Sequence, residues 1–99
     1  MTERGHAPKF DLGQTVMTKG IANEIEHNAT FAKEIQTAFA KYCAMDWGDT
    51  CKEDAQLNDD AVNNGDDRIV AKYETSIDPI FIITEYDRSA TTILFCSEY

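Results

Sequence analysis

The 99-residue chain is short of basic residues. It has nine lysines and arginines against 18 aspartates and glutamates, a net charge of −9 at pH 7 and a pI of about 4.4. A protein that binds nucleic acid directly needs the opposite balance, because it must neutralise backbone phosphates. The composition therefore argues against direct nucleic-acid binding.

Long apolar runs are also missing. No stretch approaches the roughly 18 to 20 consecutive apolar residues of a membrane span, and no apolar signal core follows the polar residues 1–9. We therefore expect no membrane partner and a cytoplasmic location. With 42% apolar residues, the chain is long enough for one hydrophobic core and too short for two. A single domain over residues 1–99 is expected, with residues 1–9 flexible.

The sequence also lacks the residue patterns of metal and catalytic sites. Its three cysteines are odd in number and have no zinc-ligand spacing, and its five glycines form no phosphate-binding loop. The run from Asp60 does not fit a calcium loop, because Val62 and Ala71 stand where ligands are required. Neither His6 nor His27 is placed beside a candidate nucleophile. We predict no catalytic residue, no metal site and no cofactor, in a protein that is not an enzyme.

What the chain does have is negative charge concentrated in one segment, residues 46–67, called here the acidic segment. It holds eight acidic side chains and one basic side chain, Lys52, and so carries seven of the nine net negative charges. A concentrated field attracts an oppositely charged partner from a distance, which indicates a basic protein surface. A plain solubility role is the alternative. The acidic residues are Asp46, Asp49, Glu53, Asp54, Asp59, Asp60, Asp66 and Asp67.

Hydrophobic periodicity predicts three helices before residue 66. The first is capped by Thr18 and reaches about His27. The second buries one side along residues 31–42, where apolar positions recur every three or four residues, and Gly48 ends the run. The third begins with a capping box formed by Thr50 and Glu53. Its apolar seam consists of Leu57, Ala61 and Val62, and residues 63–65 end it.

Period-two patterns predict strands at the other end of the chain. Residues 68–74, 80–84 and 91–96 should form an antiparallel three-stranded meander, with turns at 78–79 and 86–90. Residues 10–17 form a possible additional N-terminal strand. Helices packed on one face of such a small antiparallel sheet give an α+β fold.

Several sequence blocks resemble a family of small plasmid- and phage-associated bacterial proteins, and the block at 83–95 is the most specific of them. This resemblance covers most of the chain and implies a bacterial host and a mobile-element context. The chain departs from the family at Lys19, where relatives tend to have a proline, and this leaves the start of the first helix open. The blocks are FDLGQTV (10–16), DWGD (46–49), CKED (51–54), ITEYDRSATTILF (83–95) and EY (98–99).

Four further residues join the acidic side chains as candidates for partner binding. Trp47 is either an exposed aromatic anchor or part of the core, and its size favours the core. Glu85, Asp87 and Arg88 lie in a turn that requires none of these charges. Arg88 either contacts an anion or, more in keeping with its acidic neighbours, pairs with Glu85, Asp87 or a carboxylate of the third helix.

Three hypotheses for function follow. The first is a phage- or plasmid-encoded inhibitor whose acidic segment occupies the basic nucleic-acid groove of a CRISPR effector or restriction complex, by analogy with anti-CRISPR and antirestriction proteins of this size. In this case, reversing Asp59 and Asp60 to lysine should weaken binding and leave the fold intact. The second is a small enzyme that uses a metal or small substrate near Asp46, Asp49, Glu53 or the 85–88 turn. The third is an accessory protein that forms a homodimer through a strand edge at 68–74.

Overall fold

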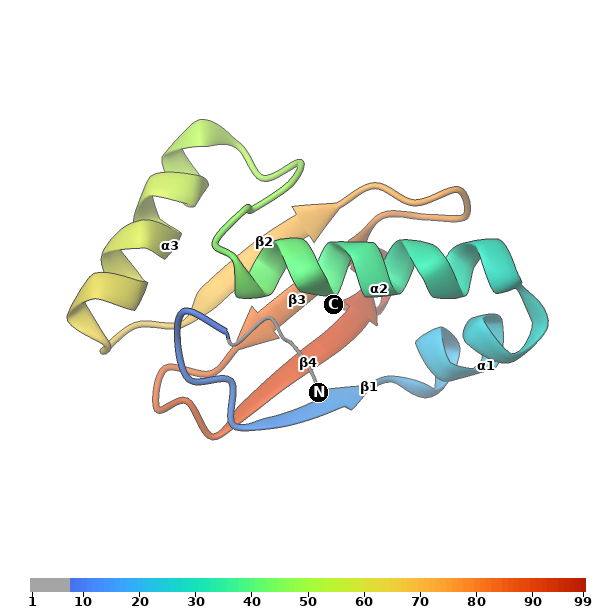
Figure 1. The fold of residues 1–99 in the computed structure, drawn as a ribbon, viewed down its shortest axis with the longest axis horizontal. Helices are drawn as coiled ribbons and strands as arrows, with labels where there is room; N and C mark the ends of the chain where they lie inside the picture. Colours follow the sequence, from blue (N-terminus) through green and yellow to red (C-terminus); the bar gives the residue numbers. More distant parts are fainter. Residues whose placement is uncertain (1–7) are drawn as a thin grey trace, which may run out of the picture.

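The structure, a computed structural model, describes residues 8–99, so most of the segment expected to be flexible lies outside the described residues. Within this range the chain forms three α-helices, four strands and one short 3-10 helix (Figure 1). The α+β class and the additional N-terminal strand are confirmed. The elements are β1 (Gln14–Met17), α1 (Lys19–His27), α2 (Ala29–Cys43), α3 (Lys52–Asn64), β2 (Ile69–Tyr73), β3 (Ile80–Thr84), β4 (Ala90–Phe95) and η1 (Cys96–Glu98).

The four strands form a mixed sheet in the order β1-β4-β3-β2. Strands β2, β3 and β4 are the predicted antiparallel meander. Strand β1 runs parallel to β4, with Gln14 opposite Ala90 and Met17 opposite Ile93. The sheet is therefore not wholly antiparallel. The reason is topological: β1 is followed by helices instead of a hairpin, and a parallel neighbour requires such a long connection.

The helices are placed in two ways around the sheet. Helix α2 crosses one face, with α1 folded back at its far end, whereas α3 lies alongside β2 at the edge of the sheet (Figure 1). The first helix begins at Lys19, and the Thr18 hydroxyl accepts from the Ile21 N–H, as predicted. Helix α2 ends at Cys43, earlier than the predicted stop at Gly48, because Met45 adopts a left-handed φ of 64°. No helix among residues 8–99 has the length and apolarity needed to cross a membrane.

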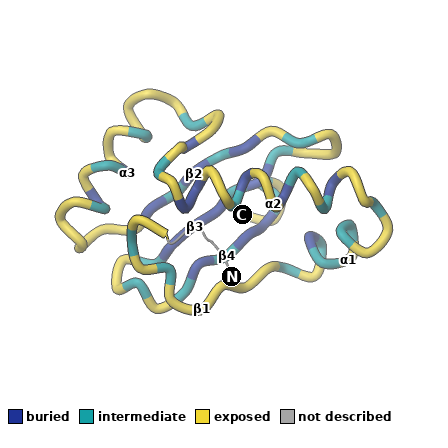
Figure 2. Tube along the Cα trace, viewed as in Figure 1, coloured by how far each residue is buried: buried dark blue, intermediate teal, exposed yellow. Residues whose placement is uncertain are grey.

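The core lies between α2 and the sheet, where buried positions on both line up (Figure 2). Phe31 and Tyr42 of α2 and Ile82 of the central strand β3 are fully buried. Burying side chains of this size removes roughly 1.5–3 kcal/mol of unfavourable hydration for each. This layer holds α2 on the sheet. The acidic segment follows α2 in the chain and lies next to β2, so the same core supports it.

A chain of hydrogen-bonded hydroxyl groups runs through this core. The Tyr42 hydroxyl lies 2.6 Å from Thr84 Oγ1, which lies 2.7 Å from Thr91 Oγ1, which in turn donates to the Leu12 carbonyl at 2.7 Å. Since a carbonyl can only accept, Thr91 donates to Leu12, Thr84 donates to Thr91 and Tyr42 donates to Thr84. The chain thus links α2, the β3–β4 pair and the segment that leads into β1. It also accounts for two threonines of the 83–95 block.

We expect stability to fall steeply at alkaline pH because of two buried tyrosines. Burial raises the pKa of both Tyr42 and Tyr73 above the usual value of 10. The unfolded chain therefore loses these protons first, so stability that is complete below about pH 10 declines as the pH rises further. Above about pH 10 the slope should approach about 1.4 kcal/mol per pH unit for each tyrosine. Urea unfolding between about pH 9 and about pH 11 measures this slope.

Matched phenylalanine variants identify the source of the slope. Tyr73→Phe should lower the slope by the share of one tyrosine, up to about 1.4 kcal/mol per pH unit, whereas Tyr86→Phe, at a tyrosine that is 64% exposed, should leave it unchanged. An equal slope in Tyr73→Phe and the wild type would refute the assignment to Tyr73.

Candidate functional site

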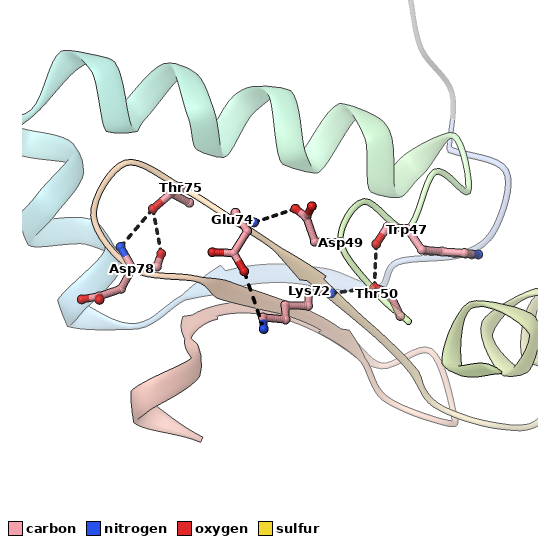
Figure 3. A network of polar contacts seen from close by, with 7 residues as sticks. All are labelled: Trp47, Asp49, Thr50, Lys72, Glu74, Thr75 and Asp78. Atoms are coloured by element: carbon pink, nitrogen blue, oxygen red, sulfur yellow. Dashed lines mark hydrogen bonds and ion pairs between the residues drawn. The ribbon is translucent and has the colours of Figure 1, made fainter. Parts of the chain in front are cut away.

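The acidic segment is attached to the outer edge of β2, starting with residues 47–50 (Figure 3). Gly48 forms a β-bridge with Lys72, and the Asp49 N–H donates to the Lys72 carbonyl at 2.9 Å. In return, the Lys72 N–H donates to Thr50 Oγ1 at 2.8 Å, and the Glu74 N–H donates to Asp49 Oδ2 at 2.8 Å. Backbone groups that an edge strand would leave open are thus satisfied by the segment beside it.

Asn58 continues this attachment from α3. Its side-chain amide donates to the Val70 carbonyl at 2.9 Å and accepts from the Val70 N–H at 3.1 Å. Asn58 is only 4% exposed, so the amide replaces a neighbouring strand at this position. The edge at 68–74, which the sequence suggested for a homodimer, is therefore already occupied along residues 70–74.

Trp47 is part of the core. It is 6% exposed, its ring packs edge-on against Tyr42 at a centroid distance of 5.4 Å, and its indole N–H donates to Asp59 Oδ1 at 2.9 Å. The core alternative for Trp47 is thus confirmed, and the ring is not an exposed anchor. The same bond gives Asp59 a structural role, so its reversal to lysine would remove a contact of the core as well as a charge.

The DWGD block is explained as a tight turn. The Gly48 N–H donates to Asp46 Oδ1 at 3.1 Å, and Gly48 has a left-handed φ of 62°. A Cβ at Gly48 would lie 2.4 Å from the Tyr73 ring, so only glycine fits both the conformation and the close approach. Asp46 and Asp49 therefore serve the fold through backbone contacts.

Helix α3 differs from its predicted start and orientation. It begins at Lys52 after Cys51, and the predicted capping box is absent because the Thr50 hydroxyl donates to the Trp47 carbonyl and accepts from Lys72. Leu57, predicted to belong to the apolar seam, is 62% exposed, while Asn58 points inward. The predicted end at residues 63–65 is confirmed, with Gly65 in the left-handed conformation.

Arg88 binds backbone carbonyls and not the predicted carboxylates. Its guanidinium donates to the carbonyl of Ala61 in α3 at 2.8 Å, to that of Glu85 at 3.2 Å and to that of Asp67. The Ala61 carbonyl lies in the last turn of α3, at the negative end of the helix dipole. It already accepts from the Gly65 N–H at 2.8 Å, and its second lone pair is free for the guanidinium of Arg88. Asp87 accepts from the Ser89 N–H at 3.0 Å, and its hydrogen bonds to Ser89 lower the pKa of its carboxyl group. The turn thus joins the sheet to the end of α3.

Five carboxylates of the acidic segment remain exposed on α3 and on the loop after it. Within residues 8–99 the only ion pair is Lys72–Glu74, so these five carboxylates have no basic partner there. Their contacts in this range are local: Asp60 accepts from Gln56, and Asp67 accepts from the Arg68 N–H. The five residues, called here the acidic face, are Glu53, Asp54, Asp60, Asp66 and Asp67.

A groove of about 560 Å³ runs between the acidic face and the sheet surface turned away from α2. Leu57, Val70 and Phe81 give it an apolar lining, and Asp54 and Asp67 contribute carboxylates. Arg68 also lines the groove, but its guanidinium contacts the Tyr99 ring and hydroxyl. A partner with mixed apolar and basic side chains could contact both surfaces at once.

The residues of the enzyme hypothesis lie in different local settings. Asp46 and Asp49 bind backbone N–H groups, Glu53 lies on the exposed first turn of α3, and Arg88 donates to carbonyls. Among residues 8–99, no group of three or more His, Cys, Asp or Glu side chains is placed to hold a metal ion. The described cysteines are free, and only Cys51 is exposed.

What the segment presents is a surface: carboxylates at the edge of the fold, supported by backbone hydrogen bonds and bordered by an apolar groove. Such an arrangement suits recognition of another macromolecule better than transformation of a small one. Neither protein-family models, nor curated proteins, nor solved structures give a significant match to this chain.

Proposed function

We propose that this chain is an acidic binding protein of a bacterial mobile element, which inhibits a host nucleic-acid-targeting complex by occupying its basic surface. The acidic face makes the contact, and the target is a CRISPR effector or a restriction complex. Inhibition follows from occupancy, because a groove filled by protein carboxylates is closed to phosphates. The blocks that resemble plasmid- and phage-associated proteins support this context.

The observation that carries the proposal is that the acidic face has no ion-pair partners within residues 8–99. Carboxylates that are already paired have little to offer a second cation, whereas free ones provide acceptors for arginine and lysine. Along α3, Glu53 and Asp60 are seven residues apart, so they recur on one side of the helix about 10 Å apart. A basic groove would meet a row of charges of this kind.

Rigidity is the second support for the proposal. The segment that bears the acidic face is joined to β2 through Asn58, Thr50 and Asp49, and to the turn through Arg88. A preformed surface loses little conformational entropy on binding, so more of the interaction energy appears as affinity. The apolar groove adds area that can be desolvated at the centre of such a contact, where charges alone contribute little.

The double variant Asp60→Lys/Asp66→Lys tests the acidic face. Asp60 lies near the C-terminal end of α3 and Asp66 lies in the loop directly after it, where positive charge interacts favourably with the helix dipole, so the fold should not be weakened. We expect capture of the target from host lysate to fall at least tenfold, about 1.4 kcal/mol. Wild-type capture should also weaken as salt rises, because the Debye length shrinks from about 10 Å at 0.1 M to about 3 Å at 1 M.

The matched control is Glu26→Lys/Asp78→Lys, which makes the same change in net charge outside the acidic segment. Both residues are exposed, and within residues 8–99 neither carboxylate forms a hydrogen bond or ion pair. Its capture should stay close to wild type. If both double variants lost target capture equally, the effect would come from net charge and not from the acidic face. If neither lost capture, the proposal would be refuted.

A further inference from the structure

The two edge strands of the sheet, β2 and β1, differ in how their outward backbone groups are bonded. At β2, the backbone groups of Val70, Lys72 and Glu74 are bonded to the acidic segment. At β1, all four residues are exposed, and Val16 and Met17 are 38% and 45% exposed. The sequence of β1, QTVM, contains neither a charge nor a proline, which are two common forms of edge protection. Within residues 8–99, this edge is therefore open for pairing.

Hydrogen bonding to β4 fixes which groups of β1 point outward. The Gln14 N–H donates to the Ser89 carbonyl at 3.1 Å, and the Thr18 N–H donates to the Ile93 carbonyl at 3.1 Å. Because strand groups alternate, the N–H and C=O of Thr15 and Met17 face away from β4. Within residues 8–99, no hydrogen bond reaches these four groups from outside the sheet.

We propose that β1 pairs antiparallel with β1 of a second copy of this chain, on a two-fold axis at Val16. In this register, Thr15 of each copy exchanges two hydrogen bonds with Met17 of the other, so all four outward groups are used on both sides. Val16 faces its own counterpart across the axis as a non-hydrogen-bonded pair, and its exposed side chain becomes covered. The two sheets join into one of eight strands.

The charge distribution favours a second copy as the occupant. A chain with a net charge of −9 would normally repel itself, but its acidic segment lies at the β2 edge, at the opposite end of the sheet from β1 (Figure 1). In the paired sheet, the two β2 strands would stand about 34 Å apart, beyond a Debye length at physiological salt. Both acidic faces would then remain open, one at each end.

Site-specific crosslinking tests the proposed register. In an antiparallel non-hydrogen-bonded pair the Cα atoms lie about 4.5 Å apart, within the range that a disulfide spans. In a Cys51→Ser background, which removes the exposed native cysteine, Val16→Cys should form a covalent dimer under mild oxidation. Gln14→Cys, also at an exposed position of the same strand, is the matched control, because its counterpart would lie about 13 Å away along the strand.

Proline and mass measurements complete the test. Thr15→Pro removes an outward N–H that β4 does not use, so it should leave the monomer folded and abolish crosslinking of Val16→Cys. The interface is short, so the wild-type mass should rise above the 11.1 kDa of one chain only at high protein concentration. Val16→Lys, which places like charges across the axis, should remain monomeric. A wild type that stays at 11.1 kDa at near-millimolar concentration, or equal crosslinking from Val16→Cys and Gln14→Cys, would overturn the proposal.

Discussion

Thr84→Val should destabilise the fold by about 2–3 kcal/mol, although it adds a methyl group to an apolar core. The two side chains have nearly the same shape, so no cavity forms. The loss arises because Thr84 is fully buried between Tyr42 and Thr91 and is the middle member of the hydroxyl chain. Valine removes two hydrogen bonds and leaves the Tyr42 hydroxyl with only a long contact of 3.5 Å to the Ile69 carbonyl. Urea unfolding followed by fluorescence of Trp47, the only tryptophan, measures the change.

The control is the same substitution at Thr92, one position along β4 from Thr91. Thr92 is half-buried, and its hydroxyl makes no hydrogen bond within residues 8–99, so Thr92→Val should change stability by less than about 0.5 kcal/mol. The effect of Tyr42→Phe on the free energy of unfolding should differ between the wild type and Thr84→Val. The substitution should destabilise the wild type but be neutral or stabilising in Thr84→Val, where it removes an unsatisfied group. Additive effects of Tyr42→Phe and Thr84→Val would mean that the hydroxyls act independently.

Sequence periodicity was sufficient wherever a local pattern decides the structure. Strand 80–84 was predicted with the bounds that β3 has, and Thr18 was identified as the cap of α1. Gly65 ends α3 as expected, in a conformation that glycine adopts at little cost. In each case the deciding residues lie within a few positions of one another.

Non-local contacts set the features that the sequence does not reveal, and the first of these is the orientation of α3 on the sheet. A helix with few apolar residues has no clear inward side, and the apolar pattern alone favours Leu57 for the seam. The open edge of β2 decides instead, because only an amide such as that of Asn58 satisfies both backbone groups of Val70. The signal available in the sequence was weak: a single asparagine inside a helix, where this residue is disfavoured without a partner.

The partners of Arg88, Thr84 and Thr91 are also set by non-local contacts, so the sequence alone does not reveal them. Backbone carbonyls such as that of Ala61 are not visible in a sequence, so a search for partners of Arg88 finds only carboxylates. Thr84 and Thr91 become neighbours only through the β3–β4 register, in which they are opposite each other. Before that register is known, strand propensity explains both threonines equally well.

Charge counting finds the acidic segment as a whole but does not resolve its individual residues. Charge counting identifies residues 46–67, yet it cannot separate carboxylates that bind the chain itself from those that face solvent. Asp46, Asp49 and Asp59 belong to the first kind, because each accepts a hydrogen bond that fixes a turn, the β2 edge or Trp47. The acidic face is what remains, and it is smaller than the acidic segment by those three residues.

Asn58→Ala should destabilise the protein by about 2–4 kcal/mol, the second large effect that we expect. It leaves the N–H and the C=O of Val70 without partners at a position where Asn58 now excludes water. It also removes the two hydrogen bonds that hold the middle of α3 on β2. The Val70 amide should therefore exchange with solvent much faster than in the wild type, and hydrogen exchange reports this independently of global unfolding.

Gln56→Ala is the matched control, because Gln56 lies on the same helix, is exposed and bonds only to Asp60 among residues 8–99. It should change stability by less than about 0.5 kcal/mol, and a similar loss in both variants would contradict the role of Asn58.

The same two variants test whether the proposed function depends on the position of the carboxylates as well as on their charge, since Asn58→Ala keeps the net charge of −9. If inhibition depends on carboxylates held in a fixed row, Asn58→Ala should weaken target capture at a temperature where it is still folded, and Gln56→Ala should not. Unchanged capture by Asn58→Ala would mean that the charge of α3 suffices and its attachment to β2 does not matter for binding.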